Sequence, residues 1–122
     1  MTMKTSLQLL LFLLITASGF VHAEADGPDF YRVKGVAGND VLNMHSEADP
    51  HANKVGEIPP GADCVRNLGC KGGLTFDEFT NLSKQEQAAI KRVRPRWCHV
   101  EYLGTRGWVS ARFLIEENCV KQ

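Results

Sequence analysis

Apolar and polar residues alternate along several short stretches of this chain, with turn residues between them. In residues 41–45, the apolar side chains of Leu42 and Met44 fall on one face of an extended strand. Asn43 and His45 fall on the opposite face, which points away from the core. The pattern predicts a mainly β domain, and strands this short and closely spaced are typical of a small barrel. Strands are expected from residue 31, at residues 41–45, 54–58, 62–68 (ended by Gly69), 97–103 and 108–110, and after residue 114.

A helical pattern replaces this alternation in the middle of the chain, at about residues 74–94. Two capping boxes, in which Ser or Thr is followed three residues later by Glu, begin there at Thr75 and Ser83. The second box predicts a helix through about Val93, which Pro95 then ends. We therefore expect a short helical insertion within one β-hairpin. The helix has one apolar stripe, formed by Ala89, Ile90 and Val93.

The first 23 residues have the pattern of a secretory signal peptide. Lys4 precedes an apolar run over residues 7–15, which is about half the roughly 20 residues that a membrane span needs. Small or aliphatic residues at Val21 and Ala23 suit cleavage after Ala23. We therefore expect a periplasmic or secreted protein that has no membrane span after processing. The expected divisions are residues 1–23 (signal peptide), 24–29 (flexible leader), 30–117 (barrel) and 118–122 (tail).

The charge of the exported part excludes some classes of partner. The chain has 14 basic and 14 acidic residues, and the signal peptide removes only Lys4, so the mature charge is −1. A neutral balance argues against nucleic acid as a partner. The sequence has no Gly-rich phosphate-binding loop, no nucleotide-binding motif and no pair of catalytic carboxylates on a helical frame. We expect no enzyme activity and no cofactor.

All four cysteines lie in the exported part, and an even count in a small exported chain predicts two disulfides. Zinc binding is disfavoured because no C-x-x-C spacing occurs, and no metal is expected. Cys98 and His99 do not form a catalytic pair, because adjacent strand residues point to opposite faces and an oxidised cysteine is no nucleophile. The cysteines are Cys64, Cys70, Cys98 and Cys119.

Two tryptophans are candidates for an aromatic binding surface. Flat indole rings bind peptides and sugars through a large apolar area with a polar edge. Trp97 points outward in the alternation of residues 97–103, together with His99. The alternative for both rings is bracing of the hairpin, and this alternative is stronger for Trp108.

Asn43 and His45 lead into a polar loop at residues 46–53, where Glu47 is a further candidate ligand contact. The alternative is an ordinary solvated loop. A basic run at residues 91–96 could contact an anion. Such a run is more often the solvated end of a helix, where cations offset the C-terminal dipole.

An ordered series of motifs resembles the bacterial SH3-like (SH3b) family, outside the helical insertion. The chain is most similar to periplasmic SH3-domain proteins with a GC…WC cysteine pair, here Gly69-Cys70 and Trp97-Cys98. It departs from the family at Met44-His45, which replaces the usual Val-Arg, and in the insertion, which could cover a groove that other members use. The matching motifs are Val41-Leu42-Asn43-Met44-His45-Ser46, Lys54-Val55-Gly56-Glu57-Ile58, Pro60-Gly61-Ala62, Trp97-Cys98-His99-Val100, Gly107-Trp108-Val109-Ser110 and Phe113-Leu114.

The resemblance implies a five- to seven-stranded SH3-like barrel with the loop at residues 46–53 beside its ligand groove. Many members bind peptidoglycan peptides or other short peptides. The expected function is therefore an exported, non-catalytic module that recognises a peptide, with the cell wall as one source. The alternative is a protein inhibitor or envelope assembly partner that uses the helical insertion as its contact surface.

The resemblance also bears on the disulfide pairing. Four cysteines allow three pairings. The GC…WC pair points to Cys70–Cys98, and these residues also face each other where the hairpin opens into the insertion. Cys64 and Cys119 are then left to pair, which would tie the last segment to the barrel.

Overall fold

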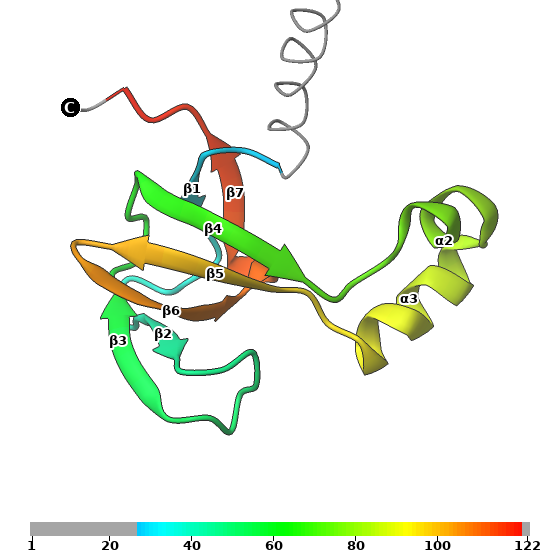
Figure 1. The fold of residues 1–122 in the computed structure, drawn as a ribbon, viewed down its shortest axis with the longest axis horizontal. Helices are drawn as coiled ribbons and strands as arrows, with labels where there is room; N and C mark the ends of the chain where they lie inside the picture. The colour runs from blue at the N-terminus through cyan, green and yellow to red at the C-terminus, as the bar shows by residue number, and fades with distance from the viewer. Residues whose placement is uncertain (1–26, 121–122) are drawn as a thin grey trace, which may run out of the picture.

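The computed structural model describes residues 27–120, which form a mainly β domain with one antiparallel sheet of seven strands (Figure 1). The signal-peptide prediction lies outside the described residues. The strand order is β3-β2-β6-β5-β4-β1-β7, and among residues 27–120 no pairing joins β3 to β7. The elements are β1 (Phe30–Val33), β2 (Leu42–His45), β3 (Lys54–Ile58), β4 (Val65–Lys71), α2 (Phe76–Asn81), α3 (Lys84–Val93), β5 (Trp97–Tyr102), β6 (Thr105–Ser110), the 3₁₀ turn η3 (Ala111–Phe113) and β7 (Leu114–Glu117).

One face of the sheet buries the apolar positions of the alternating segments. Leu42 and Met44 of β2 are buried while Asn43 between them is exposed, as the alternation predicts. In β5, Cys98 and Val100 are buried. Burial of this single continuous core is the main favourable term in folding a domain of this size. The buried core residues are Tyr31, Val33, Leu42, Met44, Ile58, Val65, Cys98, Val100, Val109 and Leu114.

Strand β4 differs from its prediction. The sequence predicts a strand at residues 62–68 ended by Gly69, whereas β4 runs from Val65 to Lys71 with Gly69 inside it. Gly69 follows a shift in the β4–β5 register and has a φ of 121°. Its N–H donates to the Asn67 side-chain oxygen at 2.8 Å. The glycine therefore supplies the left-handed conformation of a β-bulge, and the strand continues beyond it.

The helical insertion lies between β4 and β5 and projects away from the sheet (Figure 1). Both predicted capping boxes are formed, and α3 ends at Val93 as predicted. Neither helix has a buried residue, so the predicted apolar stripe is not covered by the sheet. The insertion is held at its base by Arg94, which pairs with Glu78 and donates to the Gly73 carbonyl at 2.9 Å.

The disulfides are Cys70–Cys98 and Cys64–Cys119, which confirms the predicted pairing. Cys70 and Cys98 face each other directly in the β4–β5 ladder, at the base of the insertion. Cys119 ties the chain beyond β7 to Cys64, just before β4. Across residues 27–120, no helix is long and apolar enough to cross a membrane.

Candidate functional site

Three of the residues that the sequence singles out for ligand contact line one groove of about 660 Å³. Asn43 and His45 come from β2, and Trp97 begins β5. Strand β6 lies between these strands in the sheet, so the groove runs over one end of the β2-β6-β5 segment. The other lining residues are Gly35, Val36, Ala37, Asp40, Val41, Leu42, Pro50, Pro95, Ser110, Arg112 and Phe113.

His45 and Trp97 form an edge-to-face aromatic pair in this groove. Their ring centroids are 5.8 Å apart, and the ring planes make an angle of 81°. Both residues are partly exposed, and Asn43 is exposed. The contact fixes the orientation of the indole, because edge-to-face packing is a favoured geometry for aromatic rings. The groove therefore has an ordered aromatic wall with polar groups beside it.

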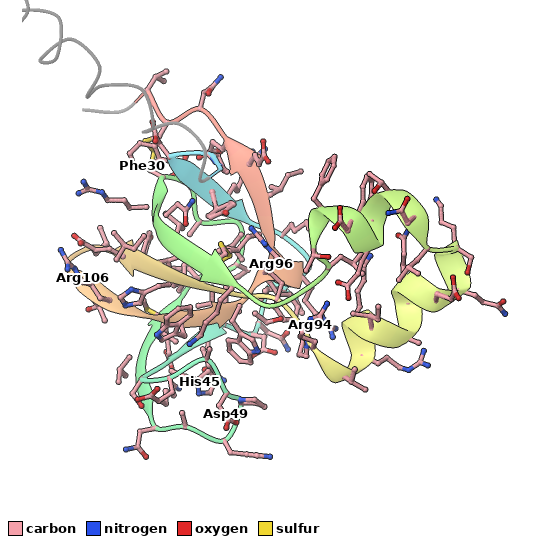
Figure 2. The ribbon with its side chains drawn as sticks, turned by 45° about the vertical axis from the view of Figure 1, so that its right-hand side comes forward. Phe30, His45, Asp49, Arg94, Arg96 and Arg106 are labelled. Carbon is pink, nitrogen blue, oxygen red and sulfur yellow. A yellow bond between two sulfur atoms is a disulfide. The ribbon has the colours of Figure 1, made fainter. Side chains whose placement is uncertain are left out.

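The orientation of His45 is set by the loop that follows it. His45 Nδ1 lies 3.1 Å from the Ala52 carbonyl oxygen. A carbonyl can only accept, so His45 Nδ1 is the donor of this hydrogen bond and Nε2 is not used by it. The backbone N–H of Ser46 also donates to the Asn53 carbonyl, which closes the base of the loop. Figure 2 labels His45 and Asp49 at the same end of the molecule.

Two of the predicted ligand-contact residues are not in the groove. Trp108 stacks on His99, with ring centroids 4.9 Å apart, and the Lys71 ammonium lies 4.8 Å from its centroid. These contacts brace the outer face of β5 and β6, which is the alternative given above for Trp108. Glu47 lies in the exposed loop, and it is not a lining residue of the groove.

The sequence alone does not single out several residues that complete the groove. Pro50 comes from the loop after β2, and Arg112 comes from η3 near the end of the chain. Arg112 lies over the Phe113 ring, with its guanidinium carbon 4.8 Å from the centroid. The Asp49-Pro50 turn was a visible signal for the loop. No local pattern links Arg112 to β2, because only the folded sheet brings them together.

Buried Tyr31 packs on the inner face of the sheet, behind the junction of β4 and β5. Its hydroxyl lies 3.3 Å from Cys70 Sγ, and because a disulfide sulfur has no proton, the hydroxyl is the donor. Burial raises the pKa of the Tyr31 hydroxyl, while the guanidinium of Arg96 acts in the opposite direction. The Arg96 side chain is therefore close to this junction, where Figure 2 also places it.

Among residues 27–120, one group of potential metal ligands comes together at Asp63, Cys64 and Glu117. The Cys64 sulfur is bonded to Cys119, so it is not available as a thiolate ligand. The Glu117 carboxylate accepts a hydrogen bond from the Cys64 backbone N–H at 2.9 Å and lies 3.5 Å from Arg32. These contacts tie the end of β7 to β1 and to the residue before β4.

Comparisons with protein-family models, curated proteins and solved structures found no match to this chain. The similarity to SH3b domains therefore rests on the sequence motifs alone.

Proposed function

We propose that this chain is an exported, non-catalytic peptide-binding module of the SH3b type, with its ligand in the groove beside Trp97. The observation that carries the proposal is the convergence of Asn43, His45 and Trp97 on one groove. The alternation of the sequence places all three side chains on the outer face of the sheet, and they come from two different strands. The loop at residues 46–53 contributes Pro50 to the groove, in agreement with its expected position beside the ligand.

The SH3-like barrel is part of this proposal. The β2–β3 and β5–β6 hairpins, followed by a 3₁₀ turn and a last strand, support it. Figure 1 also shows the β1–β7 end of the sheet lying across the central strands, as in a strongly curved sheet. We infer that the sheet curves enough to enclose the core as an open SH3-like barrel.

The chemistry of the groove suits a short peptide. The Trp97 indole offers apolar area and one N–H donor, and Pro50 and Pro95 add rigid apolar surface. His45 Nε2 and the Asn43 amide can form hydrogen bonds with peptide amides. Large apolar groups with a few placed polar groups are the usual composition of a recognition site. Peptidoglycan peptides are the expected source by family resemblance.

Export is supported by two observations. The N-terminal segment has the pattern of a signal peptide, and both disulfides close within the exported part. Disulfides persist in the periplasm and outside the cell, whereas cytosolic thiols are kept reduced.

A pull-down on purified wall sacculi and on an immobilised random peptide library tests the proposed function. Trp97→Ala should reduce capture by about tenfold or more, because a central aromatic contact carries much of the binding energy. Trp108→Ala is the matched control, since it removes an indole from the same sheet face but outside the groove. It should lower thermal stability and leave binding per folded molecule unchanged. Retention of the wild-type domain in the supernatant with both matrices at low salt would refute peptide recognition.

One observation favours the alternative function, a protein inhibitor or assembly partner. Phe76, Phe79 and Val93 of the insertion are 78%, 63% and 83% exposed. All three belong to the insertion, and an apolar patch formed there would be typical of a contact surface. Purified envelope proteins that bind the wild-type chain would distinguish the two functions. The alternative requires Phe76→Ser with Phe79→Ser to abolish the complex, and Trp97→Ala to leave it intact.

A further inference from the structure

A second pocket, of about 720 Å³, lies where the helical insertion joins the sheet. All the ionisable residues that line it are cations, namely Lys91, Arg92, Arg96 and Arg112. Its walls are otherwise apolar or small, and include Leu74, Pro95 and Ala111. We name it the basic pocket. Its charge contrasts with the mature chain as a whole, which has a net charge of −1.

No acidic side chain forms a salt bridge with a cation of the basic pocket in the described part of the chain, although Arg96 interacts with the Tyr31 hydroxyl and Arg112 lies over the Phe113 ring. Among residues 27–120, the salt bridges involve Arg32, Lys54, Arg94 and Arg106 and none of the four pocket cations. Arg94 belongs to the same basic run, but it is used structurally, because it pairs with Glu78. Lys91 and Arg92 are exposed in the last turn of α3, on the pocket wall.

The basic pocket shares part of its lining with the groove beside Trp97. Pro95, Ser110 and Arg112 line both cavities. The two cavities therefore adjoin at Arg112, and Lys91 and Arg92 of α3 line the second of them. Figure 2 shows Arg94 and Arg96 at this junction between the sheet and the helices.

We propose that the basic pocket binds the carboxylates of a peptide whose remaining part lies in the Trp97 groove, so that the ligand is an acidic peptide. This inference rests on the proposed function and specifies its ligand class. Guanidinium groups recognise carboxylates through paired, charge-assisted hydrogen bonds. A long polyanion is a poorer match, because the cations form one pocket with apolar walls and do not extend as a stripe over the near-neutral domain.

The same arrangement gives the insertion a role in binding. Lys91 and Arg92 lie on α3, whereas Arg96 and Arg112 belong to the chain next to β5 and to η3. The pocket is therefore complete only when the base of the insertion, where Arg94 and the Cys70–Cys98 disulfide lie, keeps the end of α3 beside η3. The insertion extends the groove.

Matched hexapeptide pools provide the test, measured by amide chemical-shift titration of the processed domain. In one pool, three glutamates stand before or after three randomised residues, and in the other, glutamines replace the glutamates. The variant Lys91→Gln with Arg92→Gln removes two pocket cations. The control Lys34→Gln with Arg66→Gln removes the same charge outside both cavities. Each titration is run at about 0.01 M and at about 0.15 M salt. The higher salt concentration shortens the Debye length from about 30 Å to about 8 Å and so screens charge interactions at the surface.

The glutamate pool should bind about tenfold more tightly than the glutamine pool at low salt, and should shift amides of both the groove and the basic pocket. The pocket variant should lose most of this preference, the control should keep it, and higher salt should reduce it. Equal binding of both pools in the groove would overturn the inference and leave the proposed function intact. Glutamate-dependent shifts in the basic pocket alone would overturn the claim that one peptide occupies both the pocket and the groove. Binding of neither pool would overturn both proposals.

Discussion

The sheet and the helical insertion belong to one chain of 122 residues but are stabilised in opposite ways. The sheet buries a core of ten apolar residues, six of them less than 2% exposed. The insertion has no buried residue in either helix. Its stability comes from two capping boxes, the hydrogen bonds of Gln87 to the carbonyls of Phe79 and Leu82, and the tie at Arg94.

The difference teaches where each region can fail. A core depends on burial, so its loss is global and cooperative. A solvent-exposed pair of short helices depends on local polar contacts, and isolated helices of this length are marginal in water. We therefore expect the insertion to open locally while the sheet stays folded. If the basic pocket is part of the binding site, such opening lowers affinity without unfolding the domain.

The largest expected effect is at the link between the two regions. Replacing Cys70 and Cys98 together by Ala removes a crosslink that spans 28 residues. The chain-entropy model assigns such a crosslink about 3 to 4 kcal/mol of unfolding free energy. Urea denaturation should detect this loss, and hydrogen exchange should show earlier opening at α3.

Replacing Cys64 and Cys119 by Ala is the matched control for that experiment. It also removes a disulfide, one that ties the chain after β7 to the start of β4. It should destabilise the domain to a similar extent and leave exchange at α3 unchanged relative to β4 and β5. Equal loosening of α3 in both variants would show that the disulfide at the base has no specific role in holding the insertion.

A close approach of two backbones within the sheet gives the second prediction. Gly107 is buried, and a Cβ there would lie 2.9 Å from both Met44 Cβ and Val55 Cγ2. Gly107→Ala should therefore cost about 1 to 3 kcal/mol through overpacking. Gly38→Ala is the control, since a Cβ there meets nothing within 4 Å, and its effect should stay within about 0.5 kcal/mol. Equal denaturation midpoints for the two variants would contradict the packing at Gly107.

The features that could be predicted from the sequence are those with a local cause. Alternation placed Met44 in the core, and the capping boxes located both helices. The same alternation placed His45 and Trp97 on the outer face, where they meet in the groove. These predictions depend only on neighbours within a few positions of each other along the chain.

The rest depends on contacts between distant segments. Glycine is common where strands end, which suggested that the strand stops at Gly69. In the fold, the positive φ of Gly69 forms a bulge, and β4 continues beyond it. Trp108 shares the outer face with Trp97, yet its stacking on His99 is set by strand register. The meeting of Arg112 with β2, and of the α3 cations with η3, requires the complete sheet order.

The third prediction concerns the caps of the insertion. Ser83→Ala removes the hydroxyl that accepts the Glu86 N–H at 3.1 Å, and Thr75→Ala removes the matching bond in α2. Each loss should cost about 1 kcal/mol of local helix stability. Hydrogen exchange should accelerate at α2 and α3 while the urea midpoint of the sheet hardly moves. Ser83→Thr keeps the hydroxyl and should behave like the wild type. If urea denaturation of the sheet showed the whole loss of about 1 kcal/mol, both regions would unfold as one unit.

The smallest expected effect is a pH dependence confined to the insertion. The Thr75 backbone N–H donates to the Glu78 carboxylate at 2.8 Å, and this bond is the largest cause of a lowered pKa for Glu78. Burial acts in the opposite direction, and the Thr75 hydroxyl and the Arg94 guanidinium lower the pKa further. Because the charged form is favoured in the folded state, its stabilising contribution is complete above the ordinary value of 4.5 and is lost as pH falls through the folded-state pKa.

Acidification from about pH 6 to about pH 3 should therefore loosen α2 and the base of the insertion before the sheet responds. The Cα chemical shifts of residues 76–81 measure this loosening directly. Glu78→Gln keeps an acceptor for the Thr75 N–H but carries no charge, so its α2 should be weaker at neutral pH and should lose the Glu78-dependent part of the titration. The other acid in the first turn of α2, Asp77, stays in both proteins and serves as the internal control. An identical acid transition in wild type and Glu78→Gln would show that Glu78 does not couple the helices to their base, and that Arg94 holds the insertion through the Gly73 carbonyl alone.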